Sequence, residues 1–144
     1  MNILTEQTIE DKSRDPGTRQ RAMLADSGFA RSPVMRRLYE LAESRGVLVV
    51  WYPLPEKVNG FYFRTPKGRP VVCLNVAMRG RLRSFVFAHE LGHFCLNNGL
   101  GFQVEGDSDE RREILRRVEE ETDRFAHRLL YFIRRGLEAR GATA

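Results

Sequence analysis

The sequence has few cysteines, no long apolar run and no export signal. Its 144 residues include two cysteines, Cys73 and Cys95, which are too few for a disulfide framework, so both are expected to be thiols. No apolar stretch approaches the roughly 20 residues of a membrane-spanning helix, and residues 1–6 lack the basic and apolar regions of a signal peptide. We therefore expect a cytoplasmic protein that has no membrane partner.

A strongly basic block is also missing. The formal net charge is +5, which could suggest nucleic-acid binding, because clustered Lys and Arg side chains neutralise phosphates. Basic and acidic residues are mixed in both halves of the chain, however, and the short arginine groups are interleaved with acids. We therefore do not expect direct nucleic-acid binding.

Length and periodicity predict one α+β domain. Residues 1–32 are polar and are expected to form an N-terminal arm that is partly helical or flexible, whereas residues 33–144 form the functional domain. Helical patterns cover about Pro33 to Ser44, the apolar stretch 82–96, and a long last segment that Asp107 can cap and that reaches about Arg135. Three β-prone stretches, 47–52, 61–63 and 70–75, predict a short twisted sheet with at least one hairpin.

The apolar helix at 82–96 carries two of the three histidines of the chain. His89 and His93 are four residues apart, so their imidazoles project from the same side of the helix and can bind one metal ion. Glu90 lies about 100° round the helix from His89, beside the ligands, where it can act as a catalytic base. This H-E-x-x-H pattern predicts one Zn²⁺ per chain.

A catalytic zinc site needs a third protein ligand. The metzincin pattern would place a histidine six residues after His93, where Gly99 stands, so the ligand must come from the last helix. The apolar face of that helix is taken as Ile114, Leu115, Val118, Phe125, Leu129 and Phe132. Glu120 points away from this face, while Glu121 lies at one margin and Glu119 at the other, farther out. Periodicity therefore favours Glu121, with Glu119 as the alternative.

Other polar residues are placed less well for a metal. His127 lies about 120° from Glu121 round the helix, which suits a role beside the ligands or at the surface. His127 and Tyr131 are also candidates to stabilise an oxyanion, and the sequence does not choose between them. Cys95 should face away from His93. The acids at 105–110 could bind calcium, but helix capping and the helix dipole explain them more simply.

The two motifs together resemble the ImmA/IrrE family of metallopeptidases. The segment Phe87-Ala88-His89-Glu90-Leu91-Gly92-His93 is followed by residues 121–130, which are similar to the Glu-Ala-Asn/Asp-x-Phe-Ala pattern of that family, with Thr122 where Ala is usual. The similarity spans about residues 33–132. It implies a small zincin-like, gluzincin-like domain in which a short sheet packs on the H-E-x-x-H helix and on a long C-terminal helix.

The resemblance also implies ligands and a substrate. Zinc would be held by His89, His93 and Glu121, with Glu90 as the acid and base, and the substrate would be a helix-turn-helix transcriptional repressor of a mobile element or a DNA-damage response. Strand 70–74 would offer an exposed edge to an extended substrate. Two alternatives stay open: a non-catalytic, zinc-stapled module that binds a repressor or nucleic acid, and a zinc hydrolase with another substrate.

Overall fold

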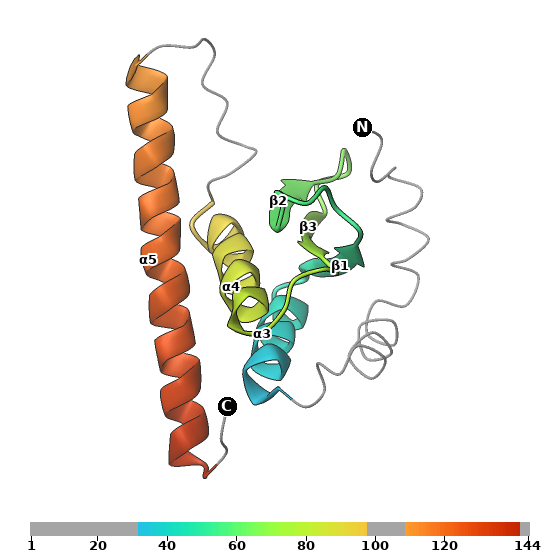
Figure 1. Ribbon diagram of the computed structural model, residues 1–144, viewed down its shortest axis with the longest axis vertical. Helices are drawn as coiled ribbons and strands as arrows, with labels where there is room; N and C mark the ends of the chain where they lie inside the picture. The colour runs from blue at the N-terminus through green and yellow to red at the C-terminus, as the bar shows by residue number, and fades with distance from the viewer. Residues whose placement is uncertain (1–31, 98–108, 142–144) are drawn as a thin grey trace.

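The computed structural model describes residues 32–97 and 109–141, and it has the predicted α+β architecture (Figure 1). Its elements are α3 (Pro33–Ser44), β1 (Leu48–Tyr52), β2 (Gly60–Arg64), β3 (Pro70–Asn75), α4 (Arg81–Cys95) and α5 (Asp109–Ala139). The last helix is longer than predicted. Most of the predicted arm and the capping residue Asp107 lie outside the described residues. Over the part of the chain that is described, no helix is both long enough and apolar enough to cross a membrane.

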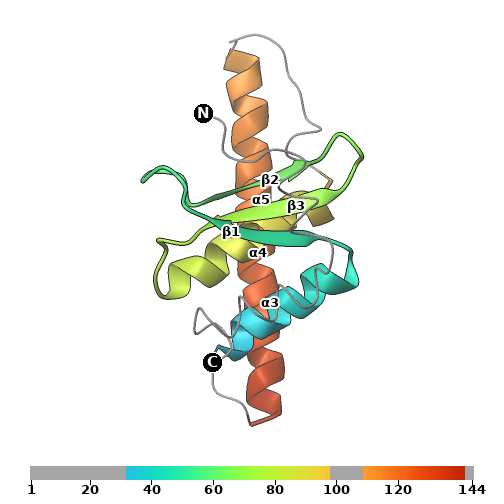
Figure 2. The same ribbon diagram turned by 90° about the vertical axis from the view of Figure 1, so that its right-hand side faces the viewer.

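The three strands form one sheet in the order β1-β3-β2 (Figure 2). β1 runs parallel to β3, and β2 pairs with β3 in the antiparallel sense, which confirms the predicted hairpin. β3 is therefore the central strand and is hydrogen-bonded on both sides. The expectation that residues 70–74 offer an exposed edge to a substrate is wrong, because the edges of this sheet are β1 and β2.

The described helices lie on one face of the sheet (Figures 1 and 2). The side chains that the strands direct towards them belong to the main core, which also holds residues of all three helices. Ser32 begins α3 by accepting a hydrogen bond from the Met35 amide at 3.3 Å, and Pro33 occupies the first turn. Tyr39 of α3 stacks edge-on against Phe87 of α4, with ring centroids 5.1 Å apart, so α3 anchors the buried helix.

The buried stripe of α5 is not the predicted one. Its fully buried residues are Thr122, Ala126, Leu130 and Leu137. Phe132, which was assigned to the core face, is 68% exposed. The reason lies in Gly92 of α4, where a Cβ atom would stand 3.0 Å from both Thr122 Cγ2 and Phe125 Cδ1. The two helices approach closely at Gly92, and the buried stripe of α5 runs through the small residues Thr122 and Ala126 before it reaches Leu130.

Candidate metal centre

His89 and His93 lie one turn apart on α4 and face the same way, as predicted. Their ring centroids are 4.8 Å apart, with planes at 84°, and both side chains are largely shielded from solvent. The helix supports them with packed apolar residues, among them Phe87 and Leu91. Both imidazoles are thereby held on a rigid element with one ring nitrogen directed towards α5.

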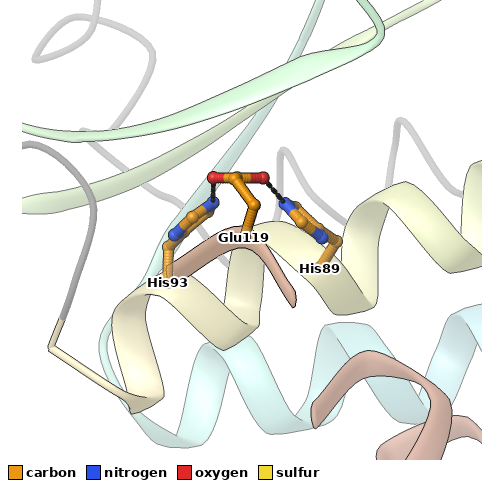
Figure 3. Close-up of side chains that lie close together, drawn as sticks. All are labelled: His89, His93 and Glu119. Carbon is orange, nitrogen blue, oxygen red and sulfur yellow. Dashed lines mark ion pairs between the residues drawn. The ribbon is translucent and has the colours of Figure 1, made fainter. Parts of the chain in front are cut away.

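Glu119 of α5 meets both rings (Figure 3). Its Oε2 lies 3.1 Å from His89 Nε2, and its Oε1 lies 3.3 Å from His93 Nε2. The ligand atoms of the three residues all lie within 4.8 Å of one another. One carboxylate thus spans two imidazoles, and the three side chains converge from two helices on one point.

Of the two acids that the sequence offered as a third ligand, the structure brings Glu119, and not the favoured Glu121, to the histidines, and the metal-binding role stays a prediction. Glu119 precedes the buried Thr122 by three residues and Ala126 by seven, so it lies on the side of α5 that faces α4. Glu121 is exposed and lies about 100° away from Thr122. The periodicity argument failed because it centred the face on the large residues at its margin. Glu120 points away, as predicted, and pairs with Arg116.

Sequence reasoning missed Asp123. Its Oδ1 lies 2.8 Å from His89 Nδ1, on the opposite side of the ring from Glu119, although the contact does not meet hydrogen-bond geometry. Asp123 follows Glu119 by four residues, so the two acids occupy successive turns of one stripe. That spacing was the available signal, once Glu119 had been chosen as the residue that faces the histidines.

Glu90 lies next to these residues and is 7% exposed. Burial, and to a lesser extent the negative charge of Glu119, raises the pKa of Glu90 from its ordinary 4.5 to about 8. A carboxyl group with this pKa can take up and release a proton near neutral pH. The role of Glu90 as an acid and base stays a prediction.

The other predicted candidates do not join the cluster. His127 is exposed and stacks beside Phe85, with centroids 5.0 Å apart. Tyr131 is 58% exposed and lies twelve residues beyond Glu119, about 18 Å along the helix axis. Neither residue contacts the His89, His93 and Glu119 group in this arrangement. Cys95 is exposed and, as predicted, is not part of the group.

The donor set fits a zinc ion. Ligand atoms at 2.0 to 2.1 Å from a tetrahedral zinc stand about 3.3 to 3.4 Å from one another. The separations of 3.1 and 3.3 Å from the two Nε2 atoms, each to a different Glu119 oxygen, are of this size, and one ligand atom from each residue lies within 4.8 Å of the others. Two carboxylates, those of Glu119 and Asp123, also contact the two imidazoles. A bound cation would balance their negative charge.

Comparison with known families decides the class of the protein. The IrrE N-terminal-like domain of peptidase family M78 matches residues 42–131, which is more than half of the chain. The chain belongs to this peptidase family. The matched span includes both histidines, Glu90 and Glu119, so the cluster lies within the family domain of a metallopeptidase. No match was found among curated proteins or among solved structures.

Proposed function

We propose that the protein is a zinc-dependent endopeptidase whose metal is held by His89, His93 and Glu119. The observation that carries the proposal is the contact of one Glu119 carboxylate with the Nε2 atoms of both histidines. Two neutral imidazoles and one carboxylate would leave a tetrahedral ion one open position, as catalytic sites require. A zinc staple normally has four protein ligands, and the cluster formed by the described residues has three, so a purely structural ion is not favoured.

In this proposal, Asp123 sets which ring nitrogen of His89 carries the proton. A carboxylate beside Nδ1 favours the tautomer that carries its proton there, which leaves the lone pair of Nε2 free to bind a metal. It also restrains rotation of the ring. The histidine would thus be oriented before the metal arrives.

Glu90 is the proposed acid and base. When bound, zinc would polarise the scissile carbonyl and lower the pKa of a water molecule. The Glu90 carboxylate takes a proton from the attacking water and delivers it to the leaving amine. Its burial keeps competing water away from the carboxylate, and its raised pKa favours holding the proton between the two transfers. No covalent acyl-enzyme is required.

The edge of β2 that has no partner strand among the described residues is the proposed place for an extended substrate. β3 is internal to the sheet, while β2 is an edge strand that packs on α4. Tyr62 of β2 contacts Phe94, with centroids 6.2 Å apart, and Phe94 directly follows His93. Backbone pairing along β2 would therefore bring a peptide close to the metal ligands.

The proposed substrate is a helix-turn-helix transcriptional repressor in the cytoplasm, cleaved to relieve repression. Its support is the family resemblance. The test is to incubate the zinc-loaded protein with a repressor encoded beside it and to identify fragments by mass spectrometry. Cleavage of the repressor at a defined bond by the wild type, but not by E90Q, supports the proposal. An unfolded test protein serves as the control substrate. If the test protein is cut while the repressor stays intact under all conditions, the protein is a peptidase but the repressor is not its substrate.

A further inference from the structure

α3 lies beside the C-terminal half of α5 (Figure 1), and the two helices border a groove that is open to solvent. The groove has a volume of about 440 Å³, and its apolar walls are formed by Leu41 of α3 and by Leu129, Phe132 and Ile133 of α5. Phe132 is 68% exposed, so an aromatic ring stands in water at the margin of the groove. At Gly136, which also lines the groove, an added Cβ would meet nothing within 4 Å. The groove therefore has room for large apolar side chains of another molecule.

The charges of α5 are divided along the helix. In residues 109–123 acids outnumber arginines, and Arg112, Arg116 and Arg117 each pair with an acid of the same helix. Residues 124–140 contain five arginines and one acid, Glu138. Within the described part of the chain none of these five arginines forms an ion pair; they are Arg124, Arg128, Arg134, Arg135 and Arg140. The second half of α5 therefore carries positive charge that the described residues do not neutralise.

Part of this charge surrounds the groove. Arg140 lines it on α5, and Arg37 lines it on α3, where its Nη1 donates to Glu40 at 3.0 Å. Arg128 precedes the exposed Phe132 by four residues and Arg135 follows it by three, so both lie beside that ring on the helix surface. Guanidinium groups favour a partner that offers carboxylates or phosphates.

The apolar lining of the groove decides between these two kinds of anion. A phosphate backbone supplies charge but no aliphatic or aromatic side chain, and it would leave the walls at Leu41, Leu129 and Ile133 unfilled. A protein segment that carries both apolar and acidic side chains matches both features. An amphipathic helix presents them together, because its residues at i, i+3, i+4 and i+7 form one apolar face while acids occupy the other.

We propose that the groove between α3 and α5 binds an acidic amphipathic helix of a partner protein. Apolar side chains of that helix enter the groove, and its carboxylates pair with Arg128, Arg135 and Arg140. Ile133 lies fourteen residues beyond Glu119, about 21 Å along the helix axis, so the groove is separate from the candidate metal centre. The proposal does not depend on zinc or on peptidase activity.

Binding of designed peptides to the full chain tests the chemistry of the partner. The probe is a fluorescein-labelled helical peptide of about 18 residues, with Leu and Phe on one face and Glu on the other. One control peptide has Lys in place of every Glu, and another has Ser in place of every Leu and Phe. Fluorescence anisotropy should show saturable binding of the probe that is at least about ten times tighter than that of either control and weakens as salt is raised. Equal binding of all three peptides, no saturable binding, or tighter binding of a DNA duplex of similar charge would overturn the proposal.

Two pairs of variants test whether the peptide binds in the groove. G136L places a large side chain inside the groove and should weaken binding at least about tenfold, whereas A139L makes a similar change on the exposed end of α5, outside the groove, and should bind like the wild type. R140E should also weaken binding, whereas K57E makes the same change of charge in the exposed connection between β1 and β2 and should have little effect. Circular dichroism checks that each variant keeps its helices. Unchanged binding to G136L and R140E, or self-association of the wild type that G136L abolishes, would show that the groove does not hold such a helix.

Discussion

Asp123 and His89 lie 2.8 Å apart, Oδ1 to Nδ1, while the opposite nitrogen of the same ring lies 3.1 Å from Glu119. Two acids on successive turns of α5 thus bracket one imidazole of α4. The pairing continues along both helices, because His93 also meets Glu119 and Phe85 meets His127. The cluster therefore depends on how two antiparallel helices are aligned, and under the proposed function any change in their spacing or rotation should change metal affinity.

The first prediction tests whether Glu119 or Glu121 is the third zinc ligand. E119Q should weaken zinc binding at least about a hundredfold, since it removes one of three protein ligands. E121Q makes the same chemical change two residues away on the exposed side and should bind zinc like the wild type. Competition with a chromophoric chelator measures both. A zinc defect in E121Q with normal binding in E119Q would restore the assignment made from periodicity.

The second prediction concerns Glu90. E90Q should retain zinc and its fold but lose peptidase activity by about 10² to 10⁴-fold, the usual contribution of a general acid and base. Zinc content and a cleavage assay on the same sample separate the two effects. If E90Q were as active as the wild type, the proton would have to be carried by another group.

The third prediction concerns Asp123. D123N removes the charge beside His89 Nδ1 and should lower zinc affinity about 10 to 100-fold, as changes next to metal-binding histidines do. D109N is the matched control, because Asp109 is fully exposed at the start of the same helix. The signature of a positioning role is a shifted pH dependence of zinc binding, measured by titration at several pH values. Identical zinc-binding curves for D123N and D109N would show that Asp123 does not position His89.

The sequence was sufficient to predict the features of the fold that depend on local residue patterns. Helix 33–44, the three strands, the helix that carries His89 and His93, and the α+β class all follow from residue periodicity and capping, and the structure confirms them. The position of Glu90 next to His89 on this helix follows from the same local pattern, while its catalytic role stays a prediction.

The predictions that differ from the structure depend on contacts between helices and strands, which a local sequence pattern does not show. The preference for Glu121 rested on the assumption that large apolar residues mark the buried side of α5, but the buried residues there are Thr122, Ala126, Leu130 and Leu137, and α5 approaches α4 closely at Gly92. The rotation of α5, which brings Glu119 and Asp123 to the histidines, depends on that close approach. The edge assigned to β3 was wrong because strand order depends on a crossover that no local pattern encodes.

The fourth prediction tests this close approach. G92A should lower the free energy of unfolding by about 1 to 3 kcal/mol, since its Cβ would overlap Thr122 and Phe125 at 3.0 Å, although alanine's helix propensity offsets part of the loss. Adding T122A should recover part of the stability. G136A is the matched control, because a Cβ there meets nothing within 4 Å, and it should be neutral or stabilising. Urea unfolding measures all of these variants, and G92A behaving like G136A would contradict the packing argument.

The fifth prediction follows from the raised pKa of Glu90 in protein kept free of metal by a chelator. Because the folded pKa of about 8 exceeds the unfolded value near 4.5, the stability that the protonated carboxyl contributes is complete below pH 4.5 and is lost as the pH rises through 8. The wild type should therefore lose stability relative to E90Q across this window, by at most about 3 kcal/mol at pH 7, and the difference should level off above pH 8. E121Q, which changes an exposed carboxylate, should track the wild type at every pH. Urea unfolding at pH 5, 7 and 9 gives the comparison, and a constant difference between wild type and E90Q would show that Glu90 is solvated in the folded protein.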